Sequence, residues 1–302
     1  MFITTNDMSQ PTINLVCVCD NHYGVLLATL IKSIEVNHHT EENIAIYVVN
    51  DGISQKSIAK LLRSIKSEKI HLHLIKISEA IPEASKLPMD KSTYPMNIYT
   101  RFFIPNFLPD HVEKVIYMDV DMILLKDISI LWHMDMKEYL LGAVQDMTSP
   151  TFGVSWGGIP NYKELGFSAE TKHLNSGMLL INTKKWREQN IVSQLLNVMN
   201  ENLKYAAYPD QYAINVLFAD NWLEIDTSWN AYVDRPHQDP SLLHYIHRKP
   251  IYTTYAHLPE YKDLFFTYLN QTEWKGMQLI GEASRYQKKI SNVVKKFSLI
   301  FK

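Results

Sequence analysis

Cysteine is nearly absent from this chain of 302 residues. The two cysteines, Cys17 and Cys19, lie in the apolar run Val16-Cys17-Val18-Cys19. A disulfide-stabilised secreted domain needs more cysteines than this, and a zinc site needs further ligands and usually a longer spacer. We therefore expect both cysteines to act as small apolar residues of a buried strand, in a reducing compartment.

Long hydrophobic runs and an excess of one charge are also missing. No stretch reaches the roughly 18 apolar residues of a membrane span, and residues 1–10 lack the basic region and apolar core of a secretory signal. The formal net charge is -2 and the pI is about 6.6, so no global basic field attracts nucleic acid. We expect a cytoplasmic protein that does not bind nucleic acid.

The chain does have enough apolar residues for a sizeable core, 46% against 21% charged. Its N-terminal part alternates apolar runs with amphipathic stretches. These predict strands over 13–19, 44–49 and 70–77, and helices over 25–36 and after the cap residue Ser54. Such alternation predicts an α/β fold with a mostly parallel, twisted sheet and flanking helices, whose ligands bind at the carboxyl ends of the strands.

The later part of the chain continues in the same style. We expect strands over 115–118, 140–144, 178–181 and 222–225, and helices near 98–103, 184–205 and 210–218. The glycine- and proline-rich segment 149–166 is typical of an active-site or acceptor loop with little regular structure. We predict one large domain over 1–265 and a small helical C-terminal extension over 266–302.

Asp119 and Asp121 directly follow the predicted strand 115–118. Residues i and i+2 of an extended chain point to the same side, so the two carboxylates project together. Apolar residues on both sides make two adjacent negative charges costly unless a cation compensates them. The pattern therefore predicts a metal site, although strand-end aspartates that cap backbone amides are the alternative.

Several ordered segments together resemble the retaining glycosyltransferases of family 8, from about residue 14 to 262. The resemblance rests on Cys19-Asp20-Asn21-His22-Tyr23, Tyr99-Thr100-Arg101-Phe102, Val115-Ile116-Tyr117-Met118-Asp119-Val120-Asp121, Leu174-Asn175-Ser176-Gly177, Lys185-Trp186 and Tyr208-Pro209-Asp210-Gln211. It implies a GT-A fold, a UDP-galactose or UDP-glucose donor, and a glycan or glycosylated-protein acceptor. An oxygen-and-imidazole ligand set on a diphosphate suits Mn²⁺.

The resemblance also implies roles for the residues near the donor. Asp20 would hold the uracil, with Asn21 and Tyr23 beside it, and Arg101 would contact the diphosphate or the sugar. The donor sugar would face Asn175 and Asp210, and Gln211 would lie at the β-face of the anomeric carbon; Asp146 would bond hydroxyl groups of the donor sugar or lie beside the acceptor. Each has a simpler alternative: helix caps for Asp20 and Asp210, a surface arginine, a loop aspartate, and a turn at 175–177.

His257 is the expected third metal ligand, with Asp119 and Asp121. In the family this histidine is usually followed, through a glycine, by Lys-Pro-Trp. After His257 this chain has no such glycine and reaches its lysine, Lys262, one residue early. Lys262 remains a candidate for the leaving phosphate, as a flexible point charge.

The C-terminal tail 286–302 alternates lysine pairs with apolar pairs at near-helical spacing. Such a basic amphipathic helix is typical of peripheral contact with an anionic membrane, with Phe297, Ile300 and Phe301 inserted, which would place the protein at the inner face of the cell membrane. The alternatives are a helix that packs on the protein itself and a frayed end.

Two other functions compete with glycosyl transfer. A nucleotidyltransferase also uses paired aspartates, but ordinarily has a glycine-rich or basic phosphate loop after the first strand, and Asp20-Asn21-His22-Tyr23-Gly24 is not one. A non-catalytic sugar-nucleotide-binding module has no need of a metal for a leaving group. Release of free UDP from a UDP-hexose would separate the three.

Overall fold

The computed structural model describes residues 11–82, 87 and 94–300. Its main sheet has seven strands in the order β3-β2-β1-β4-β7-β6-β8, and β7 is the strand that runs antiparallel to its neighbours. The strands are β1 (Thr12–Asp20), β2 (Asn43–Asp51), β3 (Ile70–Lys76), β4 (Lys114–Met118), β6 (Leu141–Gln145), β7 (Leu174–Asn182) and β8 (Leu223–Ile225). The predicted α/β class with a mostly parallel sheet is confirmed.

A second, three-stranded sheet receives the chain after the two aspartates. It contains β5 (Met122–Leu124), β10 (Leu242–His244) and β9 (Ala231–Tyr232), in that order. The chain leaves the main sheet at the end of β4 and enters the small sheet at Met122, so Asp119 and Asp121 lie at the junction of the two sheets.

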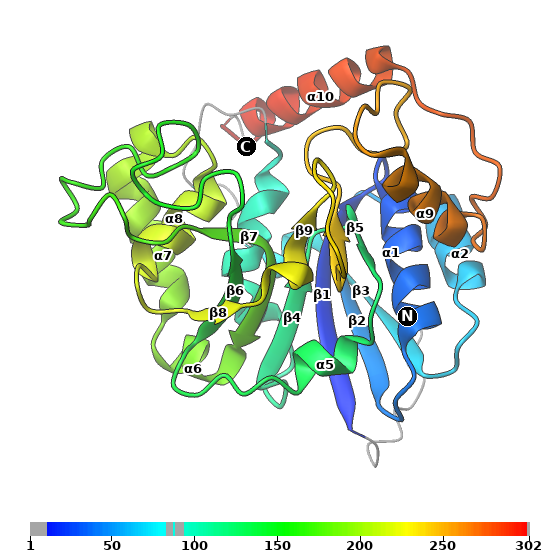
Figure 1. The fold of residues 1–302 in the computed structure, drawn as a ribbon, viewed down its shortest axis with the longest axis horizontal. Coiled ribbons are helices and arrows are strands. Elements are labelled where there is room, and N and C mark those ends of the chain that lie inside the picture. Colours follow the sequence, from blue (N-terminus) through cyan, green and yellow to red (C-terminus); the bar gives the residue numbers. More distant parts are fainter. Residues whose placement is uncertain (1–10, 83–86, 88–93, 301–302) are drawn as a thin grey trace.

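The helices cover both faces of the main sheet and connect its strands (Figure 1). They are α1 (Gly24–Asn37), α2 (Gln55–Ser64), α3 (Ile77–Ala80), α4 (Ile104–Phe107), α5 (Ile128–Trp132), α6 (Thr183–Glu188), α7 (Ile191–Asn202), α8 (Pro209–Leu217), α9 (Pro259–Leu269) and α10 (Glu282–Ile300), with the 3₁₀ helices η2 (Met96–Phe102), η3 (Leu203–Tyr205) and η4 (Thr227–Asn230). Ser54 caps α2 as expected, by accepting a hydrogen bond from Ser57 N–H.

Two apolar clusters make up the core. Leu15 and Cys17 belong to the cluster that includes α1 and α9, whereas Val16 belongs to the one that includes Trp186 of α6. This division follows from the strand itself, since successive side chains point to opposite faces. Both cysteines are buried and free, as predicted.

Strand β7 is longer than the sequence suggested. Residues 175–177 were open to a turn, but they lie inside β7, between the pairing of Asn175 with Val144 of β6 and that of Met178 with Met118 of β4. Pairing with two neighbours outweighs the local turn preference of Asn-Ser-Gly. The segment 149–166 contains no helix or strand, in agreement with the predicted loop.

The C-terminal region begins with α9, which runs through the predicted boundary at 265 and packs its buried face against the α1 cluster. The division into 1–265 and 266–302 therefore stays a proposal. Figure 1 shows α10 in red, lying across the end of the main sheet near β7 and β9. None of the helices that the structure describes is long and apolar enough to span a bilayer.

Candidate active site

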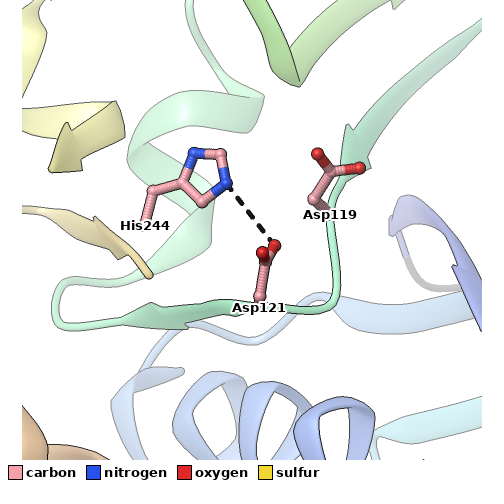
Figure 2. Close-up of side chains that lie close together, drawn as sticks. All are labelled: Asp119, Asp121 and His244. Atoms are coloured by element: carbon pink, nitrogen blue, oxygen red, sulfur yellow. Dashed lines mark ion pairs between the residues drawn. The ribbon is translucent and has the colours of Figure 1, made fainter. Parts of the chain in front are cut away.

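The two aspartates after β4 are held by backbone hydrogen bonds to different elements. Asp119 N–H donates to Gly177 O of β7 at 2.8 Å, and Tyr245 N–H donates to Asp121 O at 2.9 Å. One aspartate is thus fixed to the main sheet and the other to the residue that follows β10. Their carboxylates face one common space (Figure 2).

His244, the last residue of β10, completes this group. Its ring is buried, and Nε2 lies 3.4 Å from Asp121 Oδ1. One ligand atom from each of Asp119, Asp121 and His244 can be chosen so that all three lie within 4.8 Å of one another. Figure 2 shows the imidazole directed at Asp121, with Asp119 on the far side of the same space. Two carboxylates and an imidazole at this spacing fit one divalent cation.

Lys249 provides positive charge at the same place. Its ammonium contacts Asp121 Oδ2 and donates to Tyr245 O at 2.7 Å. Burial would raise the pKa of Asp121, but the charges of Lys249 and then His244 outweigh it and hold that pKa below its usual range. Asp121 is therefore ionised at neutral pH.

The structure places the expected ligand His257 elsewhere. Its ring packs against Tyr255 and His247, at centroid distances of 5.3 and 6.0 Å, and it does not line the pocket described below. Lys262 also lies outside the pocket, with Nζ 6.0 Å from the centre of the Tyr255 ring. His244 and Lys249, rather than His257 and Lys262, lie beside Asp121.

A sequence signal for the correct pair is present. Lys249 is followed by Pro250, five residues after His244, and this reproduces the Lys-Pro of the family motif better than the segment after His257 does. The short strand Leu242–His244 ends at the ligand, as β4 ends at Asp119. The apolar stretch before His257 is the more conspicuous local pattern, and it indicates His257 rather than the histidine that lies beside Asp121.

Arg101 is buried between two aspartates rather than free in the pocket. Its guanidinium lies 3.1 Å from Asp119 Oδ1 and 3.0 Å from Asp210 Oδ2, and it donates to Ser176 O at 2.6 Å. The Tyr117 ring lies 4.7 Å from it. Arg101 therefore joins η2, β4, β7 and α8 at the site, and the alternative of a surface charge is excluded.

Asp146, Asn175 and Gln211 form a hydrogen-bonded group beside the metal candidates. Asp146 Oδ2 accepts from Asn175 Nδ2 at 3.1 Å and from Gln211 Nε2 at 3.2 Å. Gln211 Oε1 accepts from Ser176 N–H at 3.1 Å. Burial would raise the pKa of Asp146, but the hydrogen bond from Ser149 N–H and further donors lower it overall. Burial raises the pKa of Asp210, against the opposing effect of Arg101.

The residues after β1 divide into two groups. Asp20 and Tyr23 line the pocket. Asp20 Oδ1 accepts from His22 N–H at 2.9 Å and Tyr23 N–H at 3.1 Å, so it holds the turn before α1, whereas α1 itself has no side-chain cap. Asn21 instead faces α2, where its Oδ1 accepts from Ser54 N–H and Ser57 Oγ, both at 2.9 Å.

These groups line one pocket of about 590 Å³ at the carboxyl ends of β1 and β4. The volume lies within the range of small-molecule sites. Its walls combine Asp20, Asp119, Asp121, Asp146 and Asp210 with Arg101, Lys249 and several residues of α10. Carboxylates for a cation and for hydroxyl groups, together with basic side chains, suit a metal-bound, phosphate-containing sugar donor.

Two curated bacterial proteins are similar to this chain over most of its length. General stress protein A of Bacillus subtilis is 25% identical over 282 residues, which cover 86% of this chain and 94% of that protein. Glycosyltransferase GlyB of Streptococcus pneumoniae serotype 4 is 30% identical over 261 residues, 79% of this chain but 57% of GlyB. This chain therefore spans little more than half the length of GlyB.

Among solved structures, the galactosyltransferase LgtC superposes with a TM-score of 0.71 at 22% identity, over 87% of this chain and 99% of LgtC. At this identity the likeness shows the fold, which is GT-A. The sequence profile of Glycosyl transferase family 8 matches residues 14–250, from β1 to the Lys249-Pro250 pair. The chain belongs to glycosyltransferase family 8.

Proposed function

We propose that this glycosyltransferase moves galactose or glucose from a UDP-sugar to a hydroxyl group of a glycan acceptor, with a divalent cation and retention of anomeric configuration. The observation that carries the proposal is the convergence of Asp119, Asp121 and His244 beside the group formed by Asp146, Asn175 and Gln211 in one pocket. LgtC, which has the same fold, was solved with donor and acceptor sugar analogs.

The three candidate ligands fit Mn²⁺. Two carboxylate oxygens and one imidazole nitrogen form a mixed set that suits Mn²⁺ better than the all-oxygen set preferred by Mg²⁺. Bound there, the cation would neutralise charge on the diphosphate as UDP departs. Lys249, whose ammonium contacts the Asp121 carboxylate, would stabilise the negative charge of the leaving phosphate.

Gln211 is held in a fixed orientation, as a residue beside a reacting carbon must be. Its amide nitrogen donates to Asp146 and its carbonyl oxygen accepts from Ser176 N–H. An amide is a poor nucleophile, so a glycosidase-like double displacement is disfavoured. The reaction then proceeds by substitution on one face, with the departing phosphate accepting the proton of the acceptor hydroxyl and Gln211 Oε1 stabilising the oxocarbenium-like ion.

The acceptor and the cellular place of the reaction are proposed in coarser terms. A glycan or glycosylated protein would approach through the open side of the pocket, where the loop 149–166 contributes Trp156, whose side chain is exposed. We place the enzyme in the cytoplasm, at the inner face of the membrane. The predicted membrane contact turns the lysines of the tail toward the lipid headgroups, whereas the structure turns Lys288 and Lys296 toward the protein. The side chains of Phe297, Ile300 and Phe301, which were expected to insert, lie outside the described residues.

The proposal is tested by incubating the protein with UDP-galactose or UDP-glucose, Mn²⁺ and a panel of glycan acceptors. We expect UDP release that depends on both Mn²⁺ and acceptor, and an α-linked product by NMR. Release of pyrophosphate would instead identify a nucleotidyltransferase. Binding of the UDP-sugar without release of UDP, whichever acceptor is added, would identify a binding module.

A further inference from the structure

Asn230, at the end of η4, lies between the two halves of the site. It is fully buried, with Nδ2 2.8 Å from Asn175 Oδ1 and Oδ1 2.9 Å from His244 Nδ1. No local sequence pattern marks it, and it does not line the pocket. Its contacts therefore serve Asn175 and His244 rather than a ligand.

The hydrogen bonds around Asn230 determine where the proton of His244 lies. Gly177 N–H can only donate, and it donates to Asn175 Oδ1 at 3.0 Å, so that atom is an acceptor. Asn230 must then present its NH₂ group to Asn175 and its oxygen to His244. The Nδ1 atom of His244 consequently carries a proton, and in the neutral ring Nε2 has the free lone pair.

We propose that Asn230 is a positioning residue that fixes this tautomer of His244 and directs the Nε2 lone pair at the cation. Nε2 faces Asp121 Oδ1 at 3.4 Å. An imidazole lone pair and a carboxylate are both acceptors, so the arrangement is stable when a cation lies between them. The inference rests on the metal site of the proposed function, and it also ties that site to Asn175 on the sugar side.

The test measures Mn²⁺ affinity by calorimetry in the presence of UDP, on the full chain. Asn230→Leu should weaken Mn²⁺ binding about 10 to 100-fold, the usual effect of losing such a partner. Asn230→Asp, which keeps an acceptor for Nδ1–H, should retain most of the affinity. Should Asn230→Leu fail to fold in a thermal melt, Asn230→Ala carries the same expectation. Asn202→Leu is the matched control, because Asn202 is buried in a separate network with Asn161.

A folded Asn230→Leu or Asn230→Ala variant that binds Mn²⁺ like the wild type overturns the inference. So does an Asn230→Asp variant as weak as the other two. If the wild type itself binds no Mn²⁺ with UDP, the metal of the proposed function is refuted, and the role of Asn230 with it.

A second inference concerns α10, whose basic face is turned into the pocket. Arg285, Lys288, Lys289 and Asn292 line the pocket, whereas the apolar Ile290 and Val294 are exposed, at 65% and 60%. Helices normally bury the apolar stripe and expose the charged one. Here the acidic pocket is the partner that the helix meets.

Lys288 makes the closest contact of α10 with the pocket. Its ammonium contacts Asp20 Oδ2 and donates to Asn292 Oδ1 at 2.9 Å. Its side chain is 13% exposed and that of Asp20 is 7% exposed. The other carboxylate oxygen, Oδ1, is used by His22 and Tyr23 N–H. Lys288 therefore holds the one oxygen of Asp20 that is left for a nucleobase N–H.

We infer that α10 is a lid whose Lys288 competes with the donor base for Asp20. The inference rests on the UDP-sugar donor of the proposed function and on the role that the family resemblance implies for Asp20, which is to hold the uracil. The donor binds when Lys288 releases Asp20 Oδ2. The apparent affinity for the donor is therefore the intrinsic affinity multiplied by the fraction of molecules in which Lys288 has released this oxygen. Because α10 carries the contact, nucleotide binding and the position of the C-terminal helix are coupled.

The lid is tested with Lys288→Ala in the full chain and UDP as the probe, by calorimetry with Mn²⁺ present. We expect UDP to bind about 5 to 10-fold more tightly, because the competing closed state is removed. Lys275→Ala is the control: it removes the same charge from an exposed lysine that does not line the pocket. This variant should show no gain.

Equal or weaker UDP binding by Lys288→Ala overturns the lid and leaves the proposed function intact. An equal gain in Lys275→Ala also overturns it, since the effect would then be one of general charge. Failure of both variants and the wild type to bind UDP refutes the proposed donor instead.

Discussion

Asp121 has three different partners in the site, Lys249, His244 and the backbone of Tyr245. Asp121→Ala removes a candidate ligand and leaves the ammonium of Lys249 without its carboxylate. We expect Mn²⁺ affinity to fall by at least about 10 to 100-fold and transfer to be lost. UDP release from the donor after chelation and titration with Mn²⁺ measures both.

The control for Asp121 is Asp239→Ala, which removes an exposed carboxylate paired with Lys126. It should leave transfer unchanged. Near-normal turnover of Asp121→Ala in chelator-treated buffer would contradict the assignment of this carboxylate to the metal.

Gln211 is expected to act mainly in the transition state. Its amide is already held by Asp146 and Ser176, so it needs no reorientation during the reaction. Gln211→Ala should lower kcat by about 10²-fold, a typical effect of losing one group that stabilises developing charge, and raise the donor KM less. Steady-state kinetics with varied donor separate the two constants. An unchanged kcat would remove Gln211 from the reaction.

At the scale of the elements, β7 brings the sugar side and the metal side together because Gly177 has no side chain. A Cβ there would lie 2.8 Å from His244 Cε1 and 2.9 Å from Asn175 Oδ1. Both distances are shorter than a packed interior allows. The close approach of β7 to β10 therefore requires glycine.

Gly177→Ala should push His244 and Asn175 apart, and so weaken Mn²⁺ binding and transfer together while the fold persists. Calorimetry and UDP release are the measurements. Gly166→Ala is the control for an added methyl group that meets no neighbour, since no atom lies within 4 Å of its added Cβ. Its φ of +80° adds local backbone strain, which is unrelated to the site. Wild-type activity in Gly177→Ala would show that the strands can separate without harm.

Asp127 links α5 to α1: it caps the N-terminus of α5 and binds the segment that follows α1. Its carboxylate accepts from Ser129 N–H at the start of α5, and from His39 and Thr40 N–H beyond α1. Burial would raise the pKa of Asp127, but the hydrogen bonds from His39 and Ser129 lower it from 3.8 to about 2. The ionised carboxylate therefore stabilises the folded state.

Because the folded pKa is the lower one, this stabilisation is present above the unfolded value of 3.8 and is lost as pH falls through about 2. Asp127→Ala should cost about 1 to 2 kcal/mol in the free energy of unfolding at pH 7, as for other lost caps. The difference from wild type should shrink below pH 4. Urea unfolding over this range measures it, and a constant difference at all pH values would contradict it.

At the scale of the whole molecule, the site joins the main sheet, the small sheet and α10. A ligand that binds all three should stabilise the entire fold. With Mn²⁺ and UDP at about 100 times the Kd, linkage gives about 2.7 kcal/mol, which raises Tm by several degrees. A chelator should remove most of the shift. No change in Tm at saturating UDP would contradict a site built from these three parts.

Much of the architecture followed from local pattern. Residues 15–19 and 115–118 are apolar on both faces, which suits strands covered by helices on both sides, and each is followed by a carboxylate. Since neighbouring parallel strands end at one edge, the sequence alone could assign Asp20, Asp119 and Asp121 to one site. Their spacing carried that information, because i and i+2 share a side of an extended chain.

The rest required the tertiary fold. His244 reaches Asp121 because β10 pairs with β5. Asn230 reaches His244 because η4 ends beside it. Lys288 reaches Asp20, which lies 268 residues earlier in the chain, because α10 folds back onto the pocket. No local pattern distinguishes His244 from the other histidines, and the Lys-Pro pair was a signal only in combination with the family motif. The sequence by itself determined most strands of the main sheet, the ends of β1 and β4 and the acidic pair, because these depend on neighbours along the chain. Only the tertiary structure decided which histidine and which lysine meet that pair, and that the C-terminal helix meets Asp20, because strand pairing and helix docking bring together residues that share no sequence proximity.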